Sequence, residues 1–154
     1  MKIEKQKAVA FSGHRILDDD FSENLLEETI LSYIESGYKY FLVGMAIGFD
    51  TKCFLILERL RKIYTSIKII ACIPCSEQPE YFSKKNKDLY YEMIKSADEQ
   101  VLVSPSYYKG CMQKRNKFMV DNSSVLIAYL NKKTGGTYST VKYAEKCNLQ
   151  INYV

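Results

Sequence analysis

Short apolar runs alternate with amphipathic stretches along the whole chain. The apolar runs predict strands at Ala8–Phe11, Tyr40–Val43, Ile67–Ile73, Gln100–Val103, Val125–Leu130 and Gln150–Tyr153. The third of these is nearly all apolar, as expected when helices cover both faces of a sheet. Between them apolar residues recur at helical spacing, which predicts helices at 22–37, Phe49–Tyr64, Asn86–Ser96, Met112–Asp121 and Thr137–Cys147. Regular alternation of strand and helix predicts an α/β fold: a Rossmann-like, doubly wound, mostly parallel sheet of about six strands, with helices on both faces. We expect residues 1–154 to form a single domain.

The polar and glycine-rich residues gather in the segments that follow the strands. In a doubly wound parallel sheet, ligands bind beyond the carboxyl ends of the strands, where the strand order reverses. The ligand edge is therefore expected to comprise 12–15, 44–50, 74–78, 104–110 and 131–137, with Pro74 ending the third strand.

Ser12, Gly13, His14 and Arg15 follow the first strand directly. A glycine lets the backbone approach a ligand, serine supplies a hydroxyl, and arginine offers a planar fork for phosphate. His14 is the only histidine. The alternative is an ordinary turn, with a solvated Arg15 and with His14 hydrogen-bonded to a nearby carbonyl group.

A strand passes into a helix through two glycines in the sequence Gly44, Met45, Ala46, Ile47, Gly48. Such a passage brings bare backbone and free N–H groups up to an anion. The spacing differs from the dinucleotide fingerprint Gly-x-Gly-x-x-Gly and lacks the lysine of a P-loop. Asp50 opens the next helix, where it complements the helix dipole, binds a ribose hydroxyl or orients Arg15.

The sharpest signal is a Gly-Gly pair between the fifth strand and its helix. Gly135 and Gly136, followed by Thr137, Tyr138 and Ser139, predict a nest of N–H groups with hydroxyl groups available for phosphate.

Arg115 and Asn116 lie in the helix expected at Met112–Asp121. They either contact a phosphate or belong to a solvated face of this helix. Tyr107 or Tyr138 is expected to stack on a base.

Composition narrows the function classes. The chain is 47% hydrophobic and 26% charged, as in globular proteins. The net charge is +4, with lysines and glutamates intermixed, so we predict that nucleic acid is an unlikely partner. No apolar run approaches the length of a membrane span, no secretory signal stands at the N-terminus, and five cysteines indicate free thiols. We therefore predict a cytoplasmic protein without a membrane partner.

Neither a metal nor a cofactor is expected, because one histidine and scattered cysteines lack ligand spacing. Cys72 and Cys75 have the C-x-x-C form, but Cys72 lies inside a strand, which does not favour a redox pair. Tyrosine-rich segments at 81–82, 90–91 and 107–108 either cover a homo-oligomer interface or are ordinary surface aromatics.

Taken together, these motifs resemble the SLOG superfamily, the Rossmann-like group that includes DNA-processing protein A (DprA) and the Lonely Guy (LOG) phosphoribohydrolases. The resemblance is strongest to the short YpsA-like branch. It covers nearly the whole chain and rests on Ser12-Gly13-His14-Arg15, Gly44 to Asp50, Ile73-Pro74 with Gln78, Arg115-Asn116-Lys117 and Thr134-Gly135-Gly136-Thr137. It implies a nucleotide or nucleotide-derived ligand, held by Arg15, Arg115 and the Gly135-Gly136 turn.

One departure from the family bears on activity. LOG enzymes carry a glutamate shortly after their Gly-Gly-x-Gly-Thr turn, whereas the first acid after the turn here is Glu145. Cleavage of an N-glycosidic bond needs a carboxylate near the reacting carbon. The missing glutamate weakens the case for hydrolysis but does not exclude it, since Asp50 could supply the carboxylate from the facing segment.

We therefore expect a protein that binds a nucleotide or an ADP-ribose-type signalling molecule, as a sensor or sequestering protein and not as an enzyme. The first alternative is a phosphoribohydrolase-type enzyme, with Asp50 or Glu145 as the acid. The second alternative is DprA-like binding of single-stranded DNA. DNA binding of this kind is less favoured because the sequence predicts no extra domain and its basic residues are not concentrated at the ligand edge.

Overall fold

The computed structural model describes residues 1–154 and contains one sheet in the order β4-β3-β2-β1-β5-β6. The strands are β1 (Ala8–Gly13), β2 (Tyr40–Val43), β3 (Lys68–Ile73), β4 (Glu99–Leu102), β5 (Val125–Tyr129) and β6 (Gln150–Tyr153). Every neighbouring pair is parallel. The predicted α/β fold is confirmed, and the sheet is parallel throughout.

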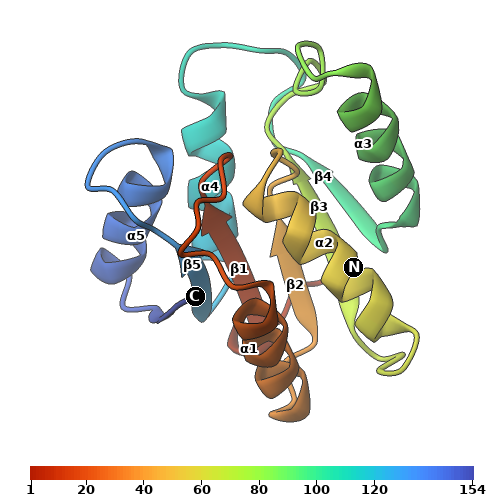
Figure 1. Ribbon diagram of the computed structural model, residues 1–154, viewed down its shortest axis with the longest axis vertical. Helices are drawn as coiled ribbons and strands as arrows, with labels where there is room; N and C mark the ends of the chain where they lie inside the picture. Colours follow the sequence, from red (N-terminus) through yellow and green to blue (C-terminus); the bar gives the residue numbers. More distant parts are fainter.

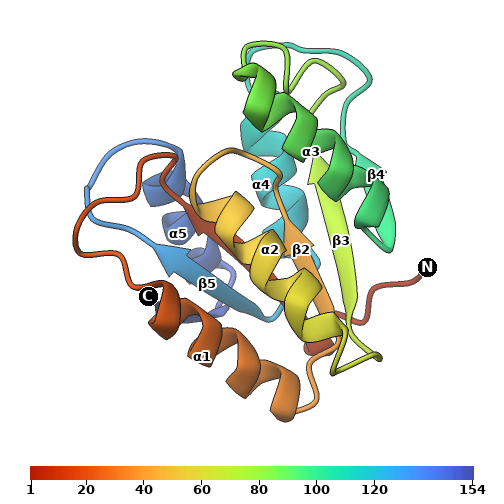
Figure 2. The same ribbon diagram turned by 45° about the vertical axis from the view of Figure 1, so that its right-hand side comes forward.

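Five α-helices connect the strands, and a short 3-10 helix, η1 (Lys5–Lys7), precedes β1. The α-helices are α1 (Glu23–Glu35), α2 (Phe49–Arg61), α3 (Lys84–Ser96), α4 (Cys111–Asp121) and α5 (Gly136–Lys146). In Figures 1 and 2, α1, α2 and α3 cover one face of the sheet, and α4 and α5 cover the other. None of the helices combines the length and the apolar character that a membrane crossing needs.

Side chains that alternate along the strands supply two apolar cores. Val9 and Phe11 of β1 point to the core beneath α1, α2 and α3, together with Leu26, Ile30, Phe54, Leu57, Tyr90 and Met93. Ala8 and Ala10 point to the opposite core, where Met119, Val120, Val141 and Ala144 come from α4 and α5. β2 and β5 are apolar at every position, and β1 and β3 are apolar except at one end, because helices cover both faces of the sheet.

Two helices start where a serine caps them. The side chains of Ser22 and Ser83 accept hydrogen bonds from the amides of Leu25 and Asn86 at 3.1 and 3.2 Å. Ser83 therefore starts α3 at Lys84, two residues before the predicted start. The other boundaries match the prediction or differ from it by at most three residues.

The strand order reverses between β1 and β5. These strands are far apart in the sequence but neighbours in the sheet, and Gly13 is aligned with Tyr129. The segments that follow the two strands therefore lie side by side at the carboxyl edge, with those after β2, β3 and β4 alongside. This is the crevice where doubly wound sheets bind ligands.

Candidate functional site

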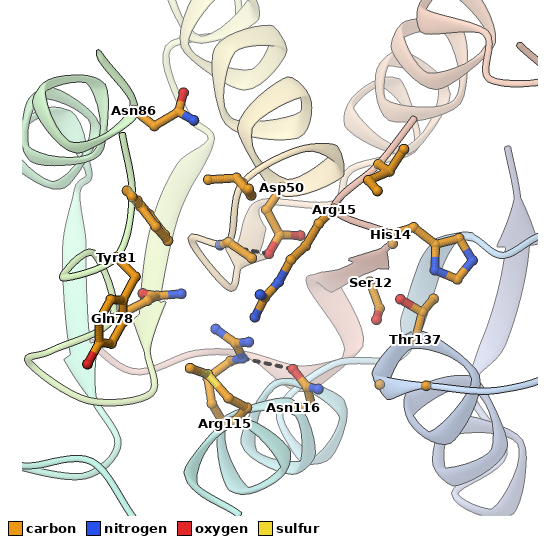
Figure 3. Close-up of a pocket in the computed structure, with 18 of the residues that line it drawn as sticks. Ser12, His14, Arg15, Asp50, Gln78, Tyr81, Asn86, Arg115, Asn116 and Thr137 are labelled. Atoms are coloured by element: carbon orange, nitrogen blue, oxygen red, sulfur yellow. Dashed lines mark hydrogen bonds between the residues drawn. The ribbon is translucent and has the colours of Figure 1, made fainter. Parts of the chain in front are cut away.

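A pocket of about 1070 Å³ lies at the carboxyl edge of the sheet, and all five of these segments line it (Figure 3). Twelve of the predicted site residues contribute to its wall: Ser12, Gly13, His14, Arg15, Ala46, Asp50, Tyr107, Arg115, Asn116, Gly135, Gly136 and Thr137. The fold thus gathers residues from four separate motifs around one space. Their contact with a ligand stays a prediction.

Six predicted residues lie outside this wall: Gly44, Met45, Gly48, Pro74, Tyr138 and Ser139. Ser139 lines a smaller hollow of about 100 Å³ between α4 and α5, which shares Asn116 and Gly136 with the main pocket. Tyr138 lies beneath Lys142, with 5.3 Å between the ammonium nitrogen and the ring centre.

The first two glycine motifs serve internal packing. A Cβ atom at Gly13 would overlap the ring of Phe49, and one at Gly48 would overlap the carbonyl group of Arg15. Gly48 also has a φ of +82°. The amide of Phe49 donates to the carbonyl of His14 at 3.2 Å. These glycines therefore let the segment after β1 lie directly on the start of α2.

The carbonyl group of Gly44 joins three elements. It accepts hydrogen bonds from Nη1 of Arg115 and from Nε2 of Gln78, the latter at 3.0 Å. Oε1 of Gln78 accepts from the hydroxyl of Tyr90 at 3.2 Å. A Cβ atom at Gly44 would lie 2.9 Å from the guanidinium carbon of Arg115 and 3.1 Å from Oδ2 of Asp50. Gly44 thus makes room for both charged groups in the pocket wall.

Arg115 is a buried cation with one unused nitrogen. It is only 6% exposed, and its Nε donates to Oδ1 of Asn116 at 2.8 Å. Nη1 also reaches the carbonyl of Cys72 at 3.4 Å, whereas Nη2 has no partner in the protein. Burial lowers the pKa of Arg115 and Asp50 acts to raise it, but an arginine remains protonated.

Arg15 faces Arg115 across the pocket. In Figure 3 the two guanidinium groups point toward each other below Asp50. Arg15 is exposed and forms no ion pair or side-chain hydrogen bond. An anion between the two cations would relieve their mutual repulsion and satisfy free donors on both.

Asp50 is a buried carboxyl group in the same wall. Its Oδ2 accepts the amide N–H of Ala46 at 3.1 Å, and its Oδ1 has no partner in the protein. Burial raises the pKa of Asp50 to about 6, although Arg115, the Ala46 amide and Arg15 act to lower it. At neutral pH the group is mostly ionised and offers an acceptor to a hydroxyl group.

His14 connects the segments after β1 and β5. Its Nε2 accepts the amide N–H of Asn131 at 3.1 Å, which assigns the proton to Nδ1. Burial and the charge of Lys132 lower the pKa of His14, while Asp18 and Asp20 act to raise it. The imidazole is therefore neutral at pH 7, and it packs edge-on against Tyr129.

The start of α5 is open to the pocket. Gly135 has a φ of +94°, and no side chain caps the helix. No atom lies within 4 Å of a Cβ built at Gly135 or at Gly136. The hydroxyl groups of Ser12 and Thr137, each residue 8% exposed, line the same space without a hydrogen-bond partner. Free N–H groups and hydroxyls in this arrangement favour a phosphate.

Several wall residues were missed by sequence reasoning as members of the site. Glu77, Glu80, Tyr81 and Asn86 come from the segment after β3 and the first turn of α3, and Lys132 follows β5. Gln78 entered as the last residue of the predicted ligand-edge segment 74–78 and through the family resemblance. The segment after β3 has no periodicity or glycine motif, so the only available signal was its place at the ligand edge.

The remaining reactive side chains do not form a second centre. All five cysteines are free thiols. Burial raises the pKa of Cys72 to about 12 and that of Cys75 to about 11, so neither is a thiolate at neutral pH. No three acidic, histidine or cysteine side chains gather as metal ligands. Glu145 pairs with Lys142 at 3.3 Å, outside the pocket.

Solved structures share this fold. The DprA protein from Streptococcus pneumoniae superposes with a TM-score of 0.68 at 18% identity, over 96% of this chain and 50% of that one. DprA from Helicobacter pylori, whose structure is described for its single-stranded DNA binding mode, has a TM-score of 0.66 at 19% identity. That match covers 97% of this chain and 65% of the DprA chain, so in both cases this chain spans less than two thirds of the other protein.

The prediction that nucleic acid is an unlikely partner is wrong. A protein with this fold, DprA from H. pylori, is described as binding single-stranded DNA. The prediction rested on the absence of a basic cluster in the sequence. The fold brings Arg15, Arg115 and Lys132 together from three distant segments at one pocket.

Sequence relatives cover most of the chain. The SPβ prophage-derived protein YoqJ of Bacillus subtilis (strain 168) is 30% identical over 137 residues, which are 81% of this chain and 78% of YoqJ. The UPF0398 protein YpsA of the same organism is 21% identical over 96% of this chain and 89% of its own length. Residues 20–154 match the family model YpsA, described as the YspA SLOG family. The predicted resemblance is confirmed: this chain belongs to the YpsA family of SLOG proteins.

Proposed function

We propose that the pocket binds a nucleotide or nucleotide-derived molecule of the ADP-ribose type, and that the protein acts as a sensor or sequestering protein for it. The observation that carries the proposal is the pair of facing guanidinium groups on Arg15 and Arg115 (Figure 3). Two cations that face one space with unused N–H donors suit a phosphate group, and the Asp50 carboxyl group beside them is already bonded to the Ala46 amide.

The surrounding groups fit the rest of such a ligand. The uncapped start of α5 offers a second anion position, next to the hydroxyls of Ser12 and Thr137. Oδ1 of Asp50 can accept a hydrogen bond from a ribose hydroxyl. A pocket of about 1070 Å³ has room for a ligand with two phosphates and a base.

The first test is a thermal-shift screen with AMP, ADP-ribose, NAD and cyclic dinucleotides, followed by mass spectrometry of each mixture. A ligand at a hundred times its dissociation constant adds about 2.7 kcal/mol of stability, which raises the melting temperature by several degrees. Recovery of the intact ligand supports a binding protein. Recovery of a free base or ribose phosphate, lost in Asp50→Asn, identifies a hydrolase instead.

Arg15→Ala is the cleaner variant of the two arginines, because Arg115 also supports the Gly44 carbonyl. Loss of one charge-assisted hydrogen bond should weaken binding by about 1.5–3 kcal/mol. The matched control is Arg59→Ala, which removes an arginine paired with Glu27 away from the pocket. Equal affinity of the wild type and Arg15→Ala for the ligand would show that Arg15 does not take part in binding.

Binding of single-stranded DNA is the second candidate function. It is favoured by the fold shared with DprA from H. pylori and by the basic side chains at the pocket. Titration of a fluorescent thymidine oligonucleotide tests it. Binding that AMP displaces places the strand in this pocket, whereas no binding at low salt rules the candidate out.

A further inference from the structure

Two exposed tyrosines stand at the end of the pocket formed by the segments after β3 and β4. The side chain of Tyr81 is 93% exposed and that of Tyr107 is 64% exposed, and both line the pocket. Because β3 and β4 are at one side of the sheet and β5 is beyond β1, these rings lie opposite the start of α5. Figure 3 shows Tyr81 and Thr137 on opposite sides of the arginine pair.

Hydrogen bonds hold the two tyrosine-bearing segments together. Oε2 of Glu77 accepts the amide N–H of Tyr107 at 2.9 Å, and the hydroxyl of Ser76 donates to the carbonyl of Pro105 at 2.9 Å. A surface made of aromatic rings on fixed backbone loses little conformational entropy when a ligand binds. These bonds fix the backbone of the two segments that carry the exposed rings, on the side of the pocket away from α5.

The same segment is also tied to the arginine pair. Gln78, next to Glu77, donates to the carbonyl of Gly44, which accepts from Arg115 as well. One carbonyl group thus fixes the position of the tyrosine-bearing segment relative to the buried cation.

We propose that Tyr81 and Tyr107 form a platform that stacks against the base of a nucleotide whose phosphate lies between Arg15 and Arg115. This inference rests on the proposed function and extends it from the phosphate to the base. Every base has an aromatic face, so stacking tolerates any base. The platform therefore supplies affinity for nucleotides in general, and Glu77 is a positioning residue for Tyr107.

The test compares AMP with ribose 5-phosphate by isothermal titration calorimetry, since ribose 5-phosphate carries a hydroxyl group where AMP carries the base. Tyr81→Ala and Tyr107→Ala should each weaken AMP binding by about tenfold or more and leave ribose 5-phosphate binding unchanged. The Phe variants keep the ring and should bind AMP as the wild type does. Tyr108→Ala, an exposed tyrosine outside the pocket wall, is the matched control.

Glu77 provides an independent readout. Glu77→Ala removes the acceptor for the Tyr107 amide and should weaken AMP alone, whereas Glu77→Gln keeps an acceptor and should restore AMP binding. A change caused only by the lost negative charge would affect AMP and ribose 5-phosphate equally, and it would count against the positioning role.

The outcomes separate the two proposals. If AMP binds the wild type no more tightly than ribose 5-phosphate, or if the Tyr→Ala variants match Tyr108→Ala, the platform is overturned and the phosphate site stands. If neither probe binds the wild type, the platform is overturned, and if no ligand of the thermal-shift screen binds either, the proposed nucleotide function fails as well.

Discussion

At the scale of single residues, Asp50 shows how burial and charge oppose each other in this pocket. Burial raises the pKa of Asp50 from its usual 3.8 to about 6, despite two nearby arginines. The folded state therefore holds this proton more tightly than the unfolded state does. Stability from this group is present below pH 4 and is lost as the pH rises to about 6.

Asp50→Asn should remove that dependence on pH, because asparagine keeps an oxygen for the Ala46 amide and does not titrate. Between pH 4 and pH 7 the wild type should lose up to about 3 kcal/mol of stability relative to the variant. Urea unfolding of both proteins at several pH values measures the difference. A difference that stays constant over this range would contradict the raised pKa.

Two glycines of the same pocket should respond in opposite ways to alanine. At Gly13 a methyl group overlaps the buried ring of Phe49, so Gly13→Ala should lower the free energy of unfolding by about 1–3 kcal/mol or more. At Gly136 the space is open, so Gly136→Ala should leave the fold intact and add about 0.4–1 kcal/mol. Denaturant unfolding compares them, and equal losses would mean that Gly136 is as confined as Gly13.

At the scale of elements, the helices divide by how they begin. Serine side chains cap α1 and α3, whereas α2, α4 and α5 follow glycines that provide no side-chain cap. Compared with a serine cap, a glycine at the residue before the helix lowers stability by only a few tenths of a kcal/mol. Gly135 leaves the first N–H groups of α5 free at the pocket. Gly48 gives space to the segment after β1 at the start of α2.

The segment between β1 and α1 depends on Tyr129 of β5. The Tyr129 hydroxyl donates to Asp20 at 2.6 Å and accepts from the Asp18 amide and from Asn131, each at 3.1 Å. This segment carries Arg15. The hydroxyl group of Tyr129 on β5 therefore helps to position a side chain that is predicted to bind phosphate.

Tyr129→Phe should therefore loosen residues 14–21 and leave the sheet unchanged. Hydrogen exchange of these amides, Asp18 above all, should become faster, while that of β2 stays slow. The control is Tyr33→Phe, which removes another tyrosine hydroxyl that bonds Asn152 and Gln150, away from this segment. Equal exchange rates at residues 14–21 in the wild type and Tyr129→Phe would show that other contacts order the segment.

At the scale of the whole molecule, the pocket has balanced charges. Arg15, Arg115 and Lys132 face it, but so do Asp50, Glu77 and Glu80. Long-range attraction of a polyanion is therefore weak, and affinity must come from close contacts.

Salt dependence should reflect this balance. If single-stranded DNA binds here, three cations limit the slope of log K against log salt concentration to about −2. Titration of a thymidine oligonucleotide at several salt concentrations measures the slope. A much steeper slope would indicate a binding surface larger than this pocket.

The fold could be predicted from the sequence because strand and helix patterns are local. The Gly135-Gly136 turn could also be predicted from the sequence, since its glycines and hydroxyl groups lie within a few consecutive residues. The roles of Gly13 and Gly48 were not, because they depend on Phe49 and Arg15 packing against them. The approach of Arg15 to Arg115 joins segments a hundred positions apart, and only the assembled sheet creates it.

The strand order also bears on how the chain is made. β1 is synthesised first, but its neighbour β5 begins only at Val125. At a translation rate of 5–20 residues per second, one edge of β1 stays unpaired for roughly 5–25 s while the ribosome completes the intervening segments. An open apolar strand edge is a site for wrong pairing between nascent chains. Before residues 125–137 emerge, the pocket lacks the wall formed by the start of α5.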